Sequence, residues 1–342
     1  MAYTAGIRSV FHRKKRSTVH YVHSNRKGDV MLKYVLKRLG YILVTLWVIV
    51  TCTFFMMKNL PGTPFDAERF SIMTPQQQER VLEMYGLNDS LPMQYVKYIK
   101  NMLKGDLGTS FTYVNQDVSK VITGRLGPSA LIGIQAVLIG LAIGLILGIL
   151  AAWKHNSGID YFTMILAVLG VSVPNFVAAA LLQYYIGLKW GVLPVGFWTG
   201  WNCSGLPSIA LSFSATAMVA RFMRTEMLDV LDQDYIVTAR AKGLSQMKVL
   251  MRHAVRNSIL PVVTILGPIV VNLMTGSLAV ENIFSIPGIG SLFVDCIKAN
   301  DYPVIMGITI FYAAFYMLIV LLVDLAYSLI DPRIRLAKGK ES

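Results

Sequence analysis

Charged side chains are scarce in this sequence. Asp, Glu, Lys and Arg make up 15% of its 342 residues, against about 25% in a typical soluble domain, and 54% of the residues are hydrophobic. The apolar residues also lack the alternation of a water-facing surface, because they gather into uninterrupted runs. This composition argues against a soluble globular protein and predicts a chain that lies in lipid.

Cysteine is also rare. The three cysteines, Cys52, Cys203 and Cys296, form no C-x-x-C pair and no metal-ligand spacing, which argues against a redox centre or a zinc site. Cys203 and Cys296 fall in segments that we expect on the same side of a membrane, so a disulfide between them stays open. Separate thiols are the preferred interpretation.

Sequence signals for chemistry are missing as well. There is no G-x-x-x-x-G-K-[ST] phosphate loop, and no cluster of His, Asp, Glu or Cys at ligand or triad spacing, which disfavours ATP hydrolysis by this chain and a membrane enzyme. Asp324 is the one acidic residue within an expected membrane span, and we prefer a structural role for it. Ion-coupled secondary transporters usually bury several ionisable groups, so that class is the weaker alternative.

Long apolar runs are what the sequence has in abundance. A helix of about 20 apolar residues crosses a hydrocarbon core of about 30 Å, and six stretches approach that length. The sequence therefore predicts an all-α integral membrane protein with six transmembrane helices, at residues 39–57, 129–153, 161–188, 206–221, 259–280 and 304–330.

The distribution of Lys and Arg predicts the orientation of these helices. Cationic loops resist translocation, and an inner N-terminus places 22 of the 32 Lys and Arg in inner segments and 10 in outer ones. Both termini are then cytoplasmic. The net charge of +13 reflects this topology and attraction to anionic lipid, and we expect no nucleic-acid partner.

The chain divides into segments of different character. The long segment after the first span carries two amphipathic stretches, at 74–85 and 92–103, and predicts an ordered external cap. The expected segments are a basic tail or extension at 1–30, the first transmembrane helix at 31–57, the cap at 58–128, a five-helix core at 129–335 with a cytoplasmic loop at 222–258, and a tail at 336–342.

Some residues within the apolar runs point to packing or to a pathway. Gly140, Gly144 and Gly148 form two G-x-x-x-G units, which we interpret as a face for close helix packing. Pro174 interrupts the third run, either beside a cavity or as a passive kink. Candidates for lining a pathway are Asn175, Gln183 and Asn272, and candidates for an external gate are Pro287, Gly288 and Gly290.

The loop at 222–258 is the most informative stretch. Residues 235–242 predict a short helix that Gly243 ends in a left-handed conformation, and Ser245 begins a second helix. Two short helices with a sharp turn predict a knob for a groove on another protein; a helix pair on anionic lipid is the alternative. On the second helix an apolar stripe of Met247, Met251 and Ala254 lies beside a cationic stripe of Lys248, Arg252 and Arg256.

This loop resembles the segment by which importer-type ABC permeases dock on their ATPase subunits. Residues 235–245 read YIVTARAKGLS, and Arg252-His253-Ala254 follows, a form typical of the peptide and nickel branch of that family. The general pattern begins with an acidic residue where Val237 stands here. The resemblance assigns ATPase docking to Thr238, Ala239, Arg240, Ala241, Lys242, Gly243, Leu244 and Ser245.

Further motifs between residue 31 and about residue 335 resemble the first permease of oligopeptide and dipeptide systems. They are MLKY at 31–34, LPGTPF at 60–65, GDLG at 105–108, SIPGIG at 285–290, DYP at 301–303 and DPRIR at 331–335.

The resemblance implies a function and a set of partners. It implies an importer-type ABC permease fold in the bacterial cytoplasmic membrane, with a pathway shared with a homologous second permease. Two cytoplasmic ATPase subunits, which hold the ATP and Mg, and an external peptide-binding protein would complete the system, and this chain would bind no cofactor or metal. LPGTPF favours oligopeptides as substrate, with dipeptide, glutathione or nickel systems as alternatives.

Overall fold

The computed structural model describes residues 15–59, 70, 72–84, 86–113, 116–274 and 278–330. These residues are almost entirely helical, and no β-strand occurs among them, apart from one isolated bridge between Thr109 and Asp117. The prediction of an all-α chain is confirmed. The motifs at 60–65 and 331–335 and the side chain of Asp324 lie outside what is described.

Two compact units make up the chain, residues 1–52 and residues 53–342. Helix α1 (Lys15–Lys58) is continuous and belongs mostly to the first unit. From Val35 onward it is apolar enough to cross a membrane, and large side chains such as Leu43 and Trp47 are exposed on it. This is the pattern of a helix whose surroundings are lipid.

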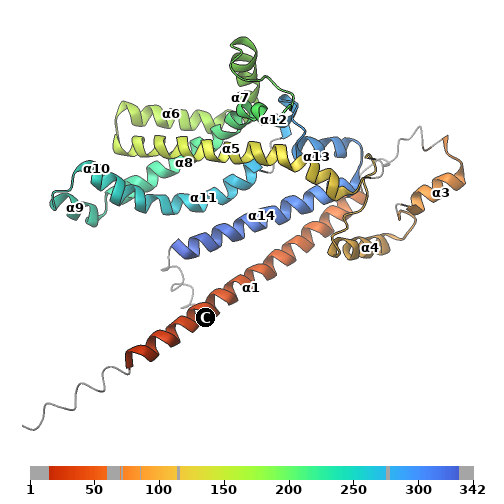
Figure 1. The fold of residues 1–342 in the computed structure, drawn as a ribbon, viewed down its shortest axis with the longest axis horizontal. Helices are drawn as coiled ribbons and strands as arrows, with labels where there is room; N and C mark the ends of the chain where they lie inside the picture. Colours follow the sequence, from red (N-terminus) through yellow and green to blue (C-terminus); the bar gives the residue numbers. More distant parts are fainter. Residues whose placement is uncertain are drawn as a thin grey trace, which may run out of the picture. The chain divides into compact units, whose positions relative to one another are not determined.

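The second unit holds the other helices (Figure 1). Helices α3 and α4 confirm the two amphipathic stretches expected in the cap. In chain order the elements are α3 (Pro75–Met84), α4 (Leu91–Leu103), α5 (Val118–Trp153), α6 (Gly158–Ser172), α7 (Asn175–Leu182), the π-helix η1 (Gln183–Lys189), the short η2 (Trp201–Ser204), α8 (Gly205–Leu231), α9 (Asp234–Ala241), α10 (Gln246–Lys248), the π-helix η3 (Val249–Val255), α11 (Arg256–Met274), α12 (Leu278–Ile283), α13 (Ile289–Lys298) and α14 (Tyr302–Ile330).

Five helical segments of the described chain are long and apolar enough to cross a membrane, and a bent pair makes a sixth if it counts as one span. The pair is α6 with the helix from Asn175 to Lys189, and its two parts meet at 102°. Pro174 stands at the break and Val173 before it is extended, as expected where proline disfavours helix at the preceding residue. The predicted six spans agree with this count, and Pro174 breaks the third one.

Helices α5 and α8 extend beyond the apolar runs that predicted them. Helix α5 begins at Val118 instead of residue 129, because Val118 and Ile122 are buried in a cluster with α13 and α14. Helix α8 continues to Leu231 instead of residue 221, because Met223 and Met227 are buried in the main core. Packing between helices therefore extends both elements beyond their lipid-crossing parts.

The glycines of α5 lie where that helix meets α8. A Cβ on Gly140 would lie 2.7 Å from the Cβ of Ala215, and one on Gly144 would lie 2.7 Å from the Cβ of Val219. Side chains do not approach so closely, so glycine is what lets the two backbones meet. The packing interpretation is confirmed, and the rising order of the contacts shows that α5 and α8 run in the same direction.

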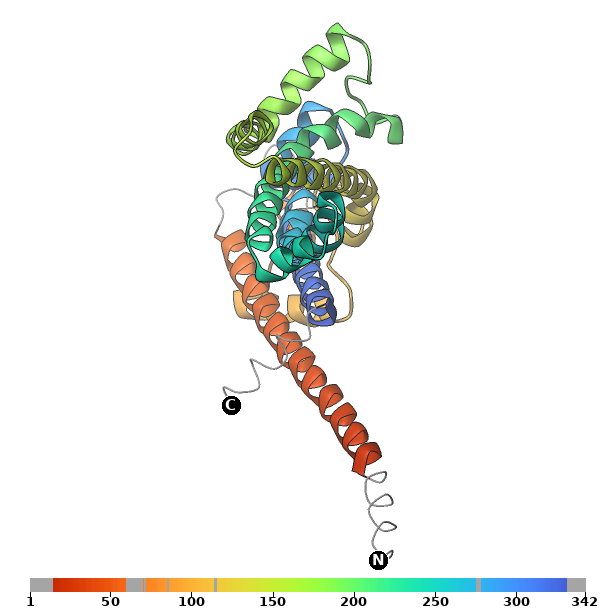
Figure 2. The ribbon, with the colours of Figure 1, turned by 90° about the vertical axis from the view of Figure 1, so that its left-hand side faces the viewer.

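The second unit has two distinct ends. Helices α9 and α10 lie at one end of α5, α8 and α11, and α13 lies at the other (Figure 1). Figure 2 looks from the end of α9 and α10, so these teal helices face the viewer. The loop after α8 and the segment after α11 therefore lie at opposite ends of the membrane-spanning helices.

Candidate functional site

Residues 234–255, which we call the knob, have a small hydrophobic core of their own. Ile236 and Ala239 of α9 and Val249 of η3 are buried together, with Val230 and Leu231 of α8 packed against them. The two parts of the knob are thus fixed to each other and to the end of α8. This confirms the expected helix pair with a sharp turn.

Gly243 makes that turn. Its φ is +76°, its N–H donates to the carbonyl of Arg240 at 2.9 Å, and the N–H of Leu244 donates to the carbonyl of Ala239 at 3.4 Å. A Cβ at Gly243 would meet nothing within 4 Å, so the requirement for glycine is conformational and not steric. Ser245 begins the next helix as predicted, but its side chain makes no capping hydrogen bond.

The apolar stripe predicted on the second helix of the knob is wrong in part. Ala254 is buried, but Met247 and Met251 are 50% and 54% exposed, and Val249 and Leu250 are buried in their place. The reason is the π-helix η3, whose wider turn shifts the inward face away from a 3.6-residue spacing.

The exposed surface of the knob is therefore mixed. Large apolar side chains stand in solvent there, from α9, the turn and the second helix: Tyr235, Val237, Leu244, Met247 and Met251. The knob also exposes the cations Arg240, Lys242, Lys248 and Arg252, and the exposed Arg256 follows at the start of α11. Of the eight residues that the resemblance assigned to docking, Ala239 is buried in the knob core and the others are exposed. Such a surface fits an apolar groove with an acidic rim.

An ion pair with a buried carboxylate joins the start of α6 to α8, and no sequence pattern revealed it. Arg224 of α8 donates from Nε to Asp160 Oδ1 at 2.5 Å and from its terminal nitrogen to Oδ2 at 2.8 Å. His155 Nδ1 lies 3.1 Å from Asp160 Oδ2, and the N–H of Asn156 donates to the same oxygen at 3.0 Å. This bidentate pair fixes the α5–α6 turn to α8 just before the knob.

At the opposite end, Glu281 of α12 is a second site residue that sequence patterns did not reveal. It is 2% exposed, and its carboxylate accepts hydrogen bonds from the Ser129 hydroxyl at 2.7 Å and from the Ser291 N–H at 2.9 Å. A Cβ on Gly290 would lie 2.9 Å from its Oε2. Burial raises the pKa of Glu281, although these hydrogen bonds oppose the shift. The gate candidates Gly288 and Gly290 thus lie directly against the buried carboxylate of Glu281.

Asp301 forms a comparable buried contact at the start of α14. Its carboxylate accepts hydrogen bonds from the Ser110 hydroxyl, from the Thr112 N–H at 3.0 Å and from the Phe111 N–H at 3.2 Å. Asp301 is fully buried. The cap is therefore joined through one carboxylate to the beginning of the last span.

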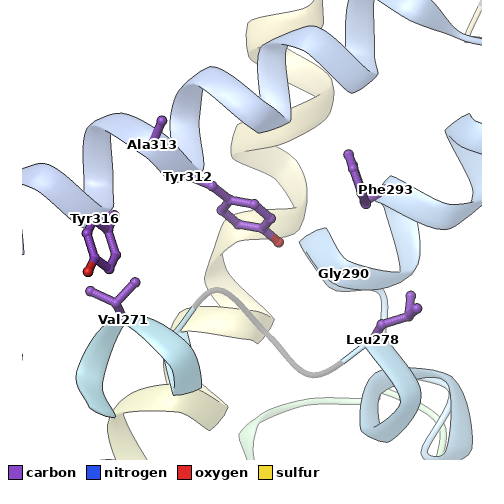
Figure 3. A pocket seen from close by; sticks show the side chains of 7 residues that line it. All are labelled: Val271, Leu278, Gly290, Phe293, Tyr312, Ala313 and Tyr316. Carbon is purple, nitrogen blue, oxygen red and sulfur yellow. The ribbon is translucent and has the colours of Figure 1, made fainter. Parts of the chain in front are cut away.

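A cavity of about 430 Å³, which we call the Tyr312 cavity, lies between the end of α11, the first residues of α12 and α13, and the middle of α14 (Figure 3). Tyr312 lies across it, with its hydroxyl directed toward the side where Gly290 and Leu278 lie. That hydroxyl is buried and has no hydrogen-bond partner among the described residues. The remaining lining residues are Val271, Phe293, Ala313 and Tyr316. The lining of this cavity is thus mostly apolar, with the two tyrosines as its hydroxyl-bearing residues.

The three residues predicted to line a pathway have different surroundings. Gln183 donates from its amide to the carbonyls of Val195 and Ile283, both at 2.8 Å, and so holds two loops together. Asn175 is the first residue of α7, and Asn272 directly follows Val271 of the cavity. Their role in a pathway stays a prediction.

The predicted choice between a disulfide and separate thiols is resolved. Cys203 and Cys296 are both free and buried, and Cys52 is free and exposed. Separate thiols, the preferred interpretation, are confirmed.

Comparison with known proteins gives two family matches. Residues 144–336 match the family described as "Binding-protein-dependent transport system inner membrane component", and residues 31–127 match its N-terminal counterpart. The solved structures include a crystal structure of an amino acid ABC transporter with histidines, at 20% identity and a TM-score of 0.47 over 63% of this chain and 94% of that chain.

The curated relatives are more similar. The dipeptide transport system permease protein DppB of Lactococcus lactis is 46% identical over 90% of this chain and 100% of its own length. The oligopeptide transport system permease protein OppB of Haemophilus influenzae is 39% identical over 89% of this chain and 100% of its own length. The chain therefore belongs to the binding-protein-dependent transport system inner membrane component family, the permease subunits of ABC importers, which leave ATP hydrolysis to separate subunits.

Proposed function

We propose that this chain is one permease subunit of an ATP-driven peptide importer in the bacterial cytoplasmic membrane. It forms the translocation pathway together with a homologous second permease, and both of its termini face the cytoplasm. Relatives named as dipeptide and oligopeptide permeases, 38% to 46% identical over nearly their whole length, support the substrate class. An external binding protein delivers the peptide to the cap side.

The observation that carries this proposal is the knob. It is rigid because of its own core, it stands at the end of α8 and α11, and it exposes Met247 and Met251 amid cations. Apolar side chains exposed together are uncommon on the surface of a soluble protein and are typical of a surface that binds another protein. We assign this surface to one of two ATPase subunits, which bind the ATP and Mg.

Transmission to the pathway follows from the helix that continues out of the knob. Residues from Gln246 to Leu273 form one helical segment, so that the docked surface and Val271 of the Tyr312 cavity belong to the same element. Closure of the ATPase dimer on ATP moves the knob and turns the cavity outward, and hydrolysis resets it. The Asp160–Arg224 pair keeps α6 and α8 moving together.

The Tyr312 cavity lies in the proposed pathway, and its lining includes Gly290, which we propose as a gate residue together with Pro287 and Gly288. A hydroxyl can donate to a peptide carbonyl or accept from a peptide N–H, and the other lining residues are mostly apolar. This arrangement recognises a peptide backbone without selecting a side chain. It supports a substrate of variable sequence, and it favours peptides over nickel, since oxygen, nitrogen and sulfur ligands are sparse there.

The proposal is tested by measuring ATPase binding and peptide uptake in the same variants. The chain is produced with its partner permease, ATPase subunits and binding protein, and reconstituted in vesicles. The double variant Met247→Asp, Met251→Asp places two carboxylates on the knob without changing its core. We expect the ATPase subunits to dissociate on purification, and ATP-driven uptake of a labelled tripeptide to fall at least tenfold.

Leu103→Asp is the matched control, because Leu103 is 78% exposed at the end of α4 in the cap. It should leave ATPase binding unchanged. If the knob variant retains its ATPase subunits, the docking assignment is wrong. If uptake is abolished by an ionophore and does not require ATP, the chain is an ion-coupled secondary transporter; competition by glutathione or nickel but not by peptides would reassign the substrate.

A further inference from the structure

A second cavity, which we call the cap cavity, lies within the second unit between the last residues of α1, the cap and the start of α14. Its volume is about 350 Å³, and the residues lining it that matter here are Phe54, Lys58, Glu83, Lys97, Tyr98 and Asp106. Protein pockets for small ligands span about 300 to 1,000 Å³, so the cap cavity is sized for a small molecule. Unlike the Tyr312 cavity, it is rich in charged groups.

Lys58 brings a positive charge into this cavity. The side chain is half-buried, with its Nζ 5.8 Å from the centre of the Phe54 ring. Among the described residues it forms no ion pair, whereas Lys97, which lines the same cavity, lies 2.6 Å from Asp89 Oδ2. A partly desolvated ammonium group without a counter-ion is unfavourable until an anion joins it.

Tyr98 adds a hydrogen-bonding group to the lining of the same cavity. Its ring stacks on Phe54 with centroids 5.9 Å apart, so the ammonium of Lys58 and the phenol of Tyr98 flank the same ring. The Tyr98 hydroxyl is buried and has no hydrogen-bond partner in the described part of the chain. Burial raises the pKa of this hydroxyl, so that it keeps its proton and remains a donor. Lys58 and Tyr98 both line the cap cavity, and an ammonium and a hydroxyl are each suitable donors to a carboxylate.

Negative charge lines the same cavity at other positions. Glu83 is exposed and has no ion pair within the described residues. Asp106 accepts from the Gly108 N–H at 2.8 Å. The cavity therefore offers a cation for an anionic end of a ligand and a free carboxylate for a cationic end.

We propose that the cap cavity is a binding site for a short peptide, in which Lys58 and Tyr98 hold the terminal carboxylate and Glu83 holds the terminal ammonium. The proposal rests on the peptide-import function proposed above and adds an entry site to it. The volume limits the occupant to a dipeptide or tripeptide, or to the end residues of a longer peptide. Because only the charged ends of the peptide are recognised, this site does not select for particular peptide side chains.

The test measures binding of alanyl-alanine to the full-length chain in lipid nanodiscs by isothermal titration calorimetry, without binding protein or ATPase. Alanyl-alaninamide, which lacks the carboxylate, should bind at least tenfold more weakly, and N-acetylated alanyl-alanine should also be weakened. Lys58→Gln should lose the preference for the free carboxylate. Lys97→Gln, a loss of the same charge in the same cavity, should keep it.

Tyr98→Phe provides a second variant that keeps the ring stacked on Phe54. It should weaken the free dipeptide several-fold and leave the amide unaffected. Equal binding of dipeptide and amide to the native chain, or a Lys58→Gln variant with unchanged preference, would overturn the site. A Lys58→Gln variant that binds the dipeptide normally but loses the external binding protein would show that the cavity seats that protein instead.

Failure of this site is distinguishable from failure of the import function. Uptake of the same dipeptide is measured in parallel in vesicles that contain the complete importer. ATP-driven uptake together with no binding to the chain in nanodiscs rejects the cap site and leaves the import function in place. Absence of uptake by the complete importer rejects the import function itself.

Discussion

The carboxyl group of Glu281 occupies the space that a side chain on Gly288 would need. A Cβ placed on Gly288 would fall well inside van der Waals contact with both oxygens and the carboxyl carbon of Glu281. The carboxylate in turn lies at the N-terminal end of α13, where it accepts from the Ser291 N–H. The turn before α13 is thus closed around a buried acid.

The first prediction concerns this contact. Gly288→Ala should lower the free energy of unfolding by about 1 to 3 kcal/mol, because an overpacked side chain must displace the Glu281 carboxylate. Gly158→Ala is the control, since a Cβ there meets nothing within 4 Å. Thermal unfolding in detergent compares the two, and equal midpoints would show that the turn accommodates a methyl group.

Stability should also depend on pH through Glu281. Burial raises its pKa above the ordinary value of 4.5, so the folded chain binds this proton more tightly than the unfolded chain. The contribution of this group to the free energy of unfolding is then greatest below that ordinary value and declines as pH rises toward the raised pKa. Glu281→Gln removes the titration and should flatten the pH profile of the unfolding midpoint; parallel profiles for the two proteins would contradict this.

Asp301 should be essential to the attachment of the cap. Asp301→Ala leaves the buried Ser110 hydroxyl and two partly buried N–H groups without their acceptor, and we expect the free energy of unfolding to fall by about 3 kcal/mol or more. Ser110→Ala should cost about 1 kcal/mol. Limited proteolysis within the cap, together with thermal unfolding, measures the effect. Asp295→Ala changes an exposed acid on α13 and should have little effect.

The effect of replacing Gly243 should depend on how readily the new residue adopts a positive φ, and not on the size of its side chain. Asn enters the left-handed region more readily than other residues, so Gly243→Asn should weaken ATPase docking only a few-fold. Gly243→Val places a β-branched residue at a φ of +76° and should distort the turn. Affinity for the purified ATPase subunit is the readout. Equal loss in both variants would mean that Gly243 itself is covered by the partner.

The sequence predicted the elements whose signal is local. Six spans followed from apolar runs, the break at Pro174 from proline chemistry, and the turn at Gly243 from a glycine between two helical patterns. The face of the second knob helix was misjudged, because no local feature announces that residues 249–255 form a π-helix. A prediction from residue spacing assumes 3.6 residues per turn, so it misplaces the buried face of a segment whose turn is wider.

The buried acids could not be predicted for a different reason. Glu281 meets Ser129 across 152 positions of the chain, and Asp301 meets Ser110 across 191. The sequence around each acid gives no sign of these distant partners. Their burial depends on how the cap, α5 and α13 come together, and that arrangement is a property of the tertiary fold.

The continuous helical segment from Gln246 to Leu273 limits which insertions and deletions the chain can tolerate. An α-helix turns by about 100° per residue, so one residue inserted between Arg256 and Val271 would rotate the knob surface by about that angle relative to the Tyr312 cavity. Substitutions along this stretch leave the angle unchanged. The length of the segment is therefore under stricter constraint than its composition, and insertions or deletions in it should uncouple the two ends even where the chain folds normally.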